Sequence, residues 1–224
     1  MKPTTLLFDV NETMLDLSVM KPVFAEQLGD DSLVADWFSM MLRYSLEVTV
    51  IDDHRPFGEL ARSALMVTAE QAGLQVSDVA IQTVTATMTK LPAHPDVAPA
   101  LARLAESGFT MATLSNSSLD AVTDQLTHAG LIQFFERQIS VDDVNAFKPD
   151  PRTYHYAVEQ MGATPADTML IAAHDWDVNG ALRAGLQAAF VDRPSATHAP
   201  HATLPDVQRP TMTGIADALL ETAS

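Results

Sequence analysis

Four short groups of polar residues in the sequence carry side chains that can act as nucleophiles, acids or bases. They are Asp9 with Thr13, residues 115–117, Lys148, and the group at 174–177. A carboxylate, a hydroxyl, an ammonium group and a second acidic cluster are components of nucleophilic and acid–base catalysis. Any one of these groups alone is more often a turn former or a helix cap than a reactive site. Their occurrence at successive strand ends predicts one shared reactive site.

The apolar runs beside these groups are short enough to be buried strands. Strands are predicted at 6–8, 109–114, 135–140, 168–173 and 187–191. Helical stripes separate them and end at glycines, as the stripe of Val97, Leu101 and Leu104 does at Gly108. This alternation indicates a parallel sheet with right-handed crossovers. Ligands of such sheets bind beyond the carboxyl ends of the strands, so the four polar groups are expected on one rim.

Residues 17–90 interrupt this alternation. Within them, the segments 32–48, 57–73 and 77–90 are predicted as helices with Met and Leu on their apolar faces, and residues 48–51 are ambiguous. We therefore expect an α/β fold. A Rossmann-like parallel sheet core is predicted from residues 1–16 and 91–224, with an inserted helical cap domain at 17–90. The Pro- and His-rich residues 194–210 are expected to form a loop.

The composition excludes several classes of function. The chain has 224 residues, and 13 Lys and Arg against 29 Asp and Glu give a net charge of −16, which opposes binding to nucleic acid or to an anionic membrane. The absence of cysteine excludes a thiol nucleophile, a thiolate metal site and disulfides. With no long apolar run and no recognisable signal peptide, a cytoplasmic location is expected. The oligomeric state is left open, a homodimer included.

Four segments resemble, in order and spacing, the motifs of the haloacid dehalogenase-like hydrolase superfamily. They are FDVNETMLD at 8–16, LSN at 114–116, FKPDPRTY at 147–154 and HDWD at 174–177. The helical insertion also falls where this family places its cap. The resemblance implies that Asp9 is the nucleophile. It assigns catalytic roles to Asp9, Thr13, Ser115, Lys148, His174 and Asp177.

Finer details favour the type II 2-haloacid dehalogenases within this superfamily. Phosphatase members usually carry an Asp two residues after the nucleophile, where this chain has Asn11, and a metal-binding carboxylate where it has His174. Tyr154 and the pair Trp176-Asp177 match the dehalogenase branch. The resemblance therefore implies that no metal or other cofactor is needed. Two alternatives remain: a Mg²⁺-dependent phosphatase using Asp9, the Asn11 carbonyl and Asp175, and a non-catalytic relic that binds a metabolite.

The implied reaction is the hydrolysis of short 2-haloalkanoic acids to 2-hydroxy acids and halide. Asp9 attacks the halogen-bearing carbon and forms an ester, and water then attacks the carboxyl carbon of Asp9. Lys148 would keep Asp9 ionised. Ser115 and backbone N–H groups would hold the substrate carboxylate or the oxyanion. Asp177, helped by His174, would orient the water, although His174 could equally be a core histidine.

Substrate contacts are predicted for Asn11, Phe38, Asn116, Tyr154 and Trp176. Phe38 is the main departure from the family, because the segment WFSMMLRY at 37–44 places it where the dehalogenases carry a substrate-binding Arg. A carboxylate must then be held without that charge, which predicts weak binding of the shortest haloacids. Glu12, where the family commonly has Gly, is expected to be a turn residue facing solvent.

Overall fold

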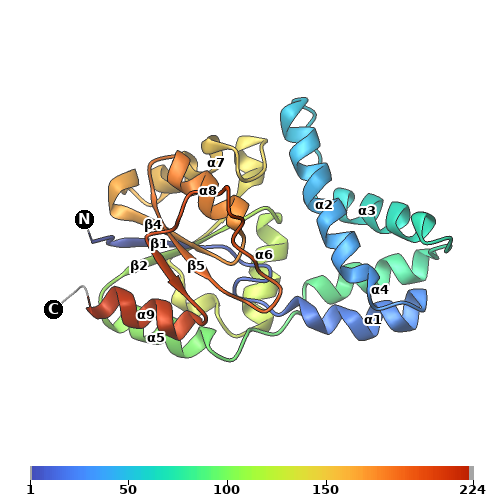
Figure 1. The fold of residues 1–224 in the computed structure, drawn as a ribbon, viewed down its shortest axis with the longest axis horizontal. Coiled ribbons are helices and arrows are strands. Elements are labelled where there is room, and N and C mark those ends of the chain that lie inside the picture. The colour runs from blue at the N-terminus through green and yellow to red at the C-terminus, as the bar shows by residue number, and fades with distance from the viewer. Residues whose placement is uncertain (1, 222–224) are drawn as a thin grey trace.

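A computed structural model of the protein describes residues 2–221, and it has two parts that lie side by side (Figure 1). The larger part is a six-stranded sheet in the order β3-β2-β1-β4-β5-β6, with every neighbouring pair parallel. The strands are β1 Thr5–Phe8, β2 Thr110–Ser115, β3 Arg137–Ser140, β4 Thr168–Ala172, β5 Gln187–Val191 and β6 Val207–Arg209. The predicted α/β class is confirmed.

The central strand β1 aligns the ends of its neighbours. Phe8 lies opposite Thr113 of β2 and Ile171 of β4, so these three strands end at nearly the same level. All four residues of β1 are buried, as expected for a strand that is covered on both faces. The residues that follow the three strands therefore meet at one edge of the sheet.

Helices cover both faces of the sheet. Figure 1 shows α7 and α8 on one face and α5 and α9 on the other. The helices of this part are α5 Val97–Glu106, α6 Leu119–His128, α7 Pro151–Gln160, α8 Asp175–Arg183 and α9 Met212–Glu221. Helix α8 starts immediately after β4 through His174, which places residues 174–177 at the carboxyl edge.

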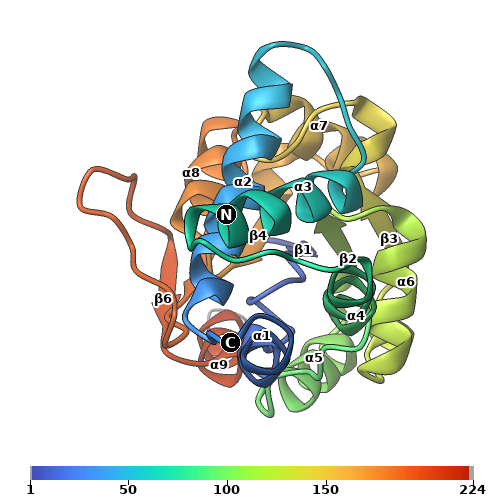
Figure 2. The ribbon, with the colours of Figure 1, turned by 90° about the vertical axis from the view of Figure 1, so that its right-hand side faces the viewer.

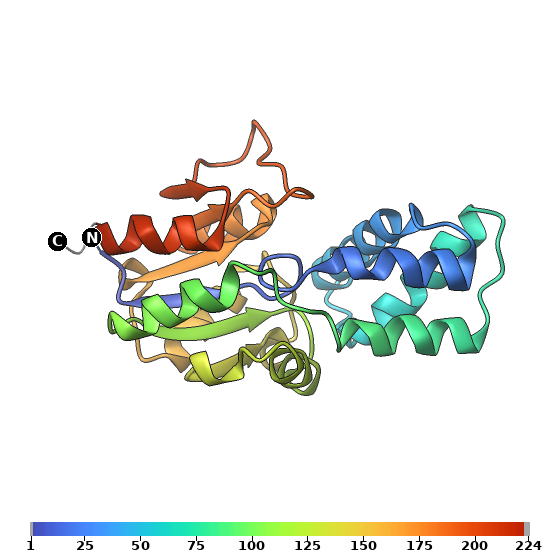
Figure 3. The same ribbon diagram turned by 90° about the horizontal axis from the view of Figure 1, so that it is seen from below.

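The smaller part is a group of four helices beside the carboxyl ends of the strands (Figure 3). They are α1 Met20–Leu28, α2 Leu33–Val50, α3 Phe57–Gln71 and α4 Asp78–Met88. Residues 48–51 are the end of α2, and α1 is a helix that the sequence analysis did not single out. Figure 2, viewed from this side, shows α2 in front of the sheet. We name this group the cap; its predicted boundaries at residues 16 and 91 stay a prediction.

The segment 194–210 differs from the expected loop because it contains β6. This strand pairs with β5 from Val207 opposite Ala189 to Arg209 opposite Val191. Asp206, just before it, extends the contact: its backbone N–H donates to Ala188 O at 2.9 Å, and its Oδ2 accepts from Ala188 N at 2.8 Å. Its residues are mostly exposed, so the strand carries no apolar pattern that a sequence analysis could detect. Among residues 2–221, no helix is long and apolar enough to cross a membrane.

Gly180 of α8 marks the closest packing between α7 and α8. A Cβ added to Gly180 would lie 2.5 Å from both Pro149 Cβ and the Tyr154 hydroxyl. Because both neighbours are packed, Gly180→Ala should lower the free energy of unfolding by about 1–3 kcal/mol, measured by urea denaturation.

Gly58→Ala in α3 is the matched control, since nothing lies within 4 Å of its added Cβ. It should leave stability unchanged or raise it by about 0.4–1 kcal/mol. Equal effects of the two substitutions would contradict the close packing at Gly180.

Candidate active site

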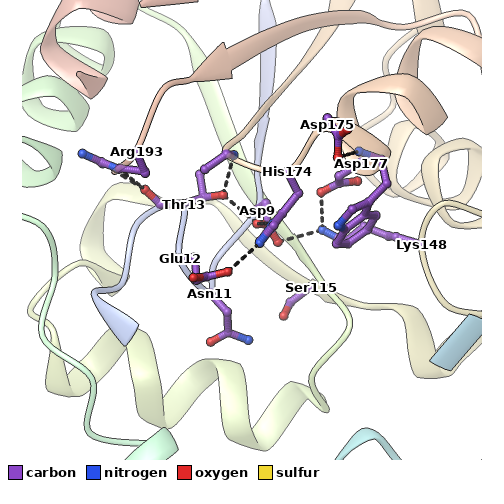
Figure 4. Close-up of polar contacts among 12 residues, drawn as sticks. Asp9, Asn11, Glu12, Thr13, Ser115, Lys148, His174, Asp175, Asp177 and Arg193 are labelled. Atoms are coloured by element: carbon purple, nitrogen blue, oxygen red, sulfur yellow. Dashed lines mark hydrogen bonds and ion pairs between the residues drawn. The ribbon is translucent and has the colours of Figure 1, made fainter. Parts of the chain in front are cut away.

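Asp9 lies directly after β1, and both of its carboxylate oxygens accept hydrogen bonds (Figure 4). Oδ1 is 2.8 Å from Lys148 Nζ. Oδ2 is 2.6 Å from Thr13 Oγ1 and 3.0 Å from His174 Nδ1. Thr13 Oγ1 in turn accepts from Ala173 N at 2.8 Å, which directs the hydroxyl proton of Thr13 toward Asp9. The carboxylate is thus fixed from two sides.

Lys148 lies buried between two carboxylates. Its Nζ is 2.8 Å from Asp9 Oδ1, 2.7 Å from Asp177 Oδ2 and 2.9 Å from Leu114 O. An ammonium group has three hydrogens, so these partners use its whole donor capacity. Burial opposes its charge, but Asp177 and Asp9 raise the pKa of Lys148 above its usual value. Burial alone would also raise the pKa of Asp9, yet Lys148 and His174 hold that pKa well below its usual range.

Asp177 is a buried counter-ion of Lys148. Its Oδ2 accepts from Lys148, and its Oδ1 accepts from the Tyr154 hydroxyl at 2.6 Å. Burial and the charge of Asp177 raise the pKa of Tyr154 well above its usual value, so Tyr154 remains a donor. Asp177 has no exposed surface. These contacts hold Lys148 in place. The function of Asp177 in orienting water and the contact of Tyr154 with substrate stay predictions.

His174 makes contacts that the sequence analysis did not foresee. Its Nδ1 is 3.0 Å from Asp9 Oδ2, and its Nε2 is 3.0 Å from Glu12 Oε2 (Figure 4). Burial alone would lower the pKa of His174, but these hydrogen bonds and the two carboxylate charges raise it from 6.5 to about 10. The prediction that Glu12 merely faces solvent is wrong, because only 19% of its side chain is exposed and it pairs with His174.

Two aromatic rings stack on the imidazole of His174. The Phe38 ring centroid lies 6.0 Å away and the Trp176 centroid 5.1 Å away, each with an interplanar angle of 24°. The Trp176 ring is also 5.9 Å from Lys148 Nζ. Aromatic faces stabilise adjacent cations. Phe38 of the cap thus lies against His174 of the core. Its predicted contact with substrate stays a prediction.

Ser115, Asn116 and Asn11 lie on the other side of Asp9. Ser115 Oγ accepts from Ser117 N at 3.1 Å, and Asn116 Oδ1 accepts from Lys148 N at 3.0 Å. The side-chain amide of Asn11 is hydrogen-bonded to other protein groups. Its Nδ2 donates to Ser117 Oγ at 3.4 Å, and its Oδ1 accepts from Gln125 Nε2 at 3.0 Å. Gln125 was missed, although a polar residue within the apolar stripe of α6 was a detectable signal.

Arg193 is a further buried residue that the sequence analysis missed. Its Nε and Nη2 donate to Thr13 O at 3.2 and 2.9 Å, and its Nη1 is 2.9 Å from both carboxylate oxygens of Asp96. The guanidinium therefore ties the turn after β1 to the start of α5. This contact fixes the backbone from which Thr13 reaches Asp9.

Two cavities lie between the cap and the sheet. One, of about 380 Å³, is lined by Ser39, Arg43, Lys148 and Trp176 among others. The second, of about 640 Å³, is lined by Glu12 and Phe38 and by further residues of the cap and core. Arg43 of α2 thus lines the same cavity as Lys148.

The side chains around Asp9 do not suit Mg²⁺, which needs several oxygen ligands. Asp175 Oδ1 accepts from Trp176 N at 2.7 Å and its Oδ2 from Ala199 N at 3.2 Å, so this carboxylate is engaged elsewhere. The position of the other metal carboxylate is His174, whose two nitrogens are paired. Within residues 2–221, no group of three or more His, Asp or Glu is arranged to hold a metal ion.

Comparisons with known proteins agree on the class of this chain. A family model for haloacid dehalogenase-like hydrolases matches residues 3–185, so the chain belongs to this family of hydrolases. It is 30% identical over 194 residues to (S)-2-haloacid dehalogenase H-109 from Pseudomonas putida, covering 85% of this chain and 86% of that protein. It is 28% identical over 217 residues to haloacetate dehalogenase H-2 from Moraxella sp. (strain B), covering 96% of each.

A solved structure shares the whole fold. The L-2-haloacid dehalogenase from Xanthobacter autotrophicus superposes with a TM-score of 0.90 at 26% sequence identity, covering 99% of this chain and 100% of that one. The resemblance predicted from the four motifs is thereby confirmed.

The charge on His174 should be visible in the pH dependence of stability. Its pKa in the folded protein, about 10, exceeds the ordinary value of 6.5. The charged His174 therefore stabilises the folded protein fully at pH values below 6.5, and this stabilisation is lost as the pH rises toward 10. Urea denaturation should show the free energy of unfolding falling across this interval in the wild-type protein. The decline should be smaller in His174→Gln, and an equal decline in both proteins would contradict the assignment.

Proposed function

We propose that the protein is a hydrolytic dehalogenase that converts short 2-haloalkanoic acids into 2-hydroxy acids and halide through an ester at Asp9. The observation that carries this proposal is the buried carboxylate of Asp9, paired with Lys148 at 2.8 Å in surroundings that do not suit Mg²⁺. Halide leaves without a proton, so the reaction needs neither the acid that Asn11 replaces nor a metal ion. The similarity to 2-haloacid dehalogenases supports the same reaction.

The hydrogen bonds of Asp9 favour Oδ1 as the attacking atom. Among the described residues, Oδ2 accepts two hydrogen bonds and Oδ1 accepts one. Oδ1 therefore keeps a lone pair for attack on the halogen-bearing carbon, and the halide departs with the electron pair of the broken bond. Lys148, which contacts Oδ1, also lines the 380 Å³ cavity through which a substrate would approach.

The substrate carboxylate needs donors other than Lys148, because all three hydrogens of Lys148 are in use. The hydroxyl of Ser115 and the side-chain amide of Asn116 are suitable neighbours. Arg43 supplies a positive charge in the same cavity. We propose that these three residues take the place of the arginine that Phe38 replaces. The cap at 17–90 would close the cavity. A cytoplasmic location and a homodimer remain expectations from the sequence.

A single-turnover experiment tests the proposed reaction. With enzyme in excess over 2-chloropropionate, in heavy-oxygen water and after exhaustive chelation, halide should be released. The label should then appear on Asp9, because water attacks the carboxyl carbon of Asp9, and the first hydroxy acid formed should carry none. Mass spectrometry of the Asp9 peptide and of the product measures both.

Asp9→Asn, nearly isosteric, should fold and release no halide. Direct labelling of the first product would mean that water attacks the substrate carbon. Loss of activity on chelation, restored by Mg²⁺, would contradict the proposed reaction in favour of a phosphatase.

Arg43→Gln tests the proposed binding of the substrate carboxylate. Loss of one charge-assisted hydrogen bond costs about 1.5–3 kcal/mol, so KM for 2-chloropropionate should rise about 10- to 100-fold with little change in kcat. Arg62→Gln is the matched control, because Arg62 is an exposed arginine of the cap that pairs with Asp78. An equal KM in the two variants would exclude Arg43 from substrate binding.

A further inference from the structure

Glu12 occupies a backbone position that is unfavourable for its residue type. Its φ angle is 60°, in the left-handed region where glycine has no steric penalty. Its side chain nevertheless turns inward and places Oε2 3.0 Å from His174 Nε2 (Figure 4). A carboxylate at this strained position indicates a function for the side chain rather than for the turn.

The pair of Glu12 and His174 is connected to the proposed nucleophile. An imidazole whose two nitrogens both face carboxylates donates from both, and it is then an imidazolium. Here the two acceptors are Glu12 Oε2 and Asp9 Oδ2, each at 3.0 Å. The stacked rings of Phe38 and Trp176 stabilise the cation. Glu12 is therefore the counter-ion that persists when Asp9 loses its charge.

That loss of charge occurs in the proposed reaction when Oδ1 is alkylated. Oδ2 then becomes the carbonyl oxygen of the ester, and it already has two donors, Thr13 Oγ1 at 2.6 Å and His174 Nδ1 at 3.0 Å. When water adds to the carboxyl carbon, the electron pair of the C=O bond moves onto Oδ2. Donors placed on the atom where negative charge develops stabilise the transition state.

We propose that Thr13 and the imidazolium of His174 form the oxyanion hole for hydrolysis of the Asp9 ester, and that Glu12 keeps His174 charged in this intermediate. In this step, the oxygen of water forms a bond to the carboxyl carbon. The bond between that carbon and Oδ1 then breaks. One proton of the water goes to the departing oxygen, giving the hydroxy acid, and the other is released to solvent as Asp9 ionises beside Lys148.

This inference rests on the proposed function and makes Glu12 a positioning residue that acts through His174. Charged groups from several elements surround His174, and each of them affects the pH at which His174 loses its proton. The charged or titratable groups are Asp9 and Glu12 after β1, His94 at 3.2 Å from the Glu12 carbonyl, Lys148 before α7, and Asp175 and Asp177 of α8. Of these, Glu12 is the one bound to Nε2.

The test separates alkylation of Asp9 from hydrolysis of the ester. Rapid-quench single turnovers with 2-chloropropionate, analysed by intact mass, follow the alkylated enzyme over time. In Glu12→Gln, alkylation should proceed at a rate close to wild type, while hydrolysis should slow by roughly 10- to 100-fold, so that the ester accumulates. The rate of ester hydrolysis in the wild-type protein should be independent of pH between about 6 and 9. In Glu12→Gln this rate should decrease as the pH rises, because His174 loses its proton.

Two further variants complete the design. Asp31→Asn removes a negative charge from the same 640 Å³ cavity without touching His174, and it should hydrolyse the ester like wild type. Glu12→Gly relieves the left-handed backbone, so it should fold at least as well as wild type and still accumulate the ester. Hydrolysis at the wild-type rate and pH dependence in both Glu12 variants would overturn the proposal. Absence of alkylated Asp9 in the wild-type protein and in both Glu12 variants, with no halide released, would instead overturn the proposed function.

Discussion

The buried ammonium group of Lys148 is the constraint on which the site depends. Removing an ammonium from water costs several kcal/mol, and the protein offsets this cost with Asp9 at 2.8 Å and Asp177 at 2.7 Å. Leaving such a buried charge without any partner typically costs about 3–5 kcal/mol, and with two carboxylates Lys148 keeps Asp177 even when Asp9 loses its charge. The proposed nucleophile is thus also one of the two carboxylates that compensate this buried charge. The same contact keeps it ionised in a chain with a net charge of −16.

His174 is a second cation at the site, and it pairs with the carboxylate oxygen of Asp9 that Lys148 does not contact. Three carboxylates, of Asp9, Glu12 and Asp177, surround Lys148 and His174. Phe38 stands where the resemblance places an arginine on the cap, and its ring stacks on His174. Positive charge next to the nucleophile thus comes from the core instead of the cap. His174 is held by two carboxylates of the core, Asp9 and Glu12.

The fold could be predicted largely from the sequence because its signals are local. The apolar run at 6–8 and the glycines after several helices, such as Gly108 and Gly130, indicate strands and helices without knowledge of their partners. Polar residues at successive strand ends follow the general geometry of parallel sheets, so Asp9, Ser115 and Lys148 could be placed on one edge. The strand β6 escaped prediction because its residues are exposed, and its pairing depends on β5.

The sequence by itself determined the α/β class and the resemblance to the haloacid dehalogenases, and it led to the proposal of Asp9 as nucleophile. Only the tertiary structure decided which partners each side chain has. Glu12 and His174 are 162 positions apart, and they meet because β1 and β4 are neighbours in the sheet. Likewise, the three bonds that saturate Lys148 come from three separate segments. The spacing of apolar residues and the residues that favour turns indicate the local conformation of the backbone. Hydrogen-bond partners and burial depend instead on how distant segments pack.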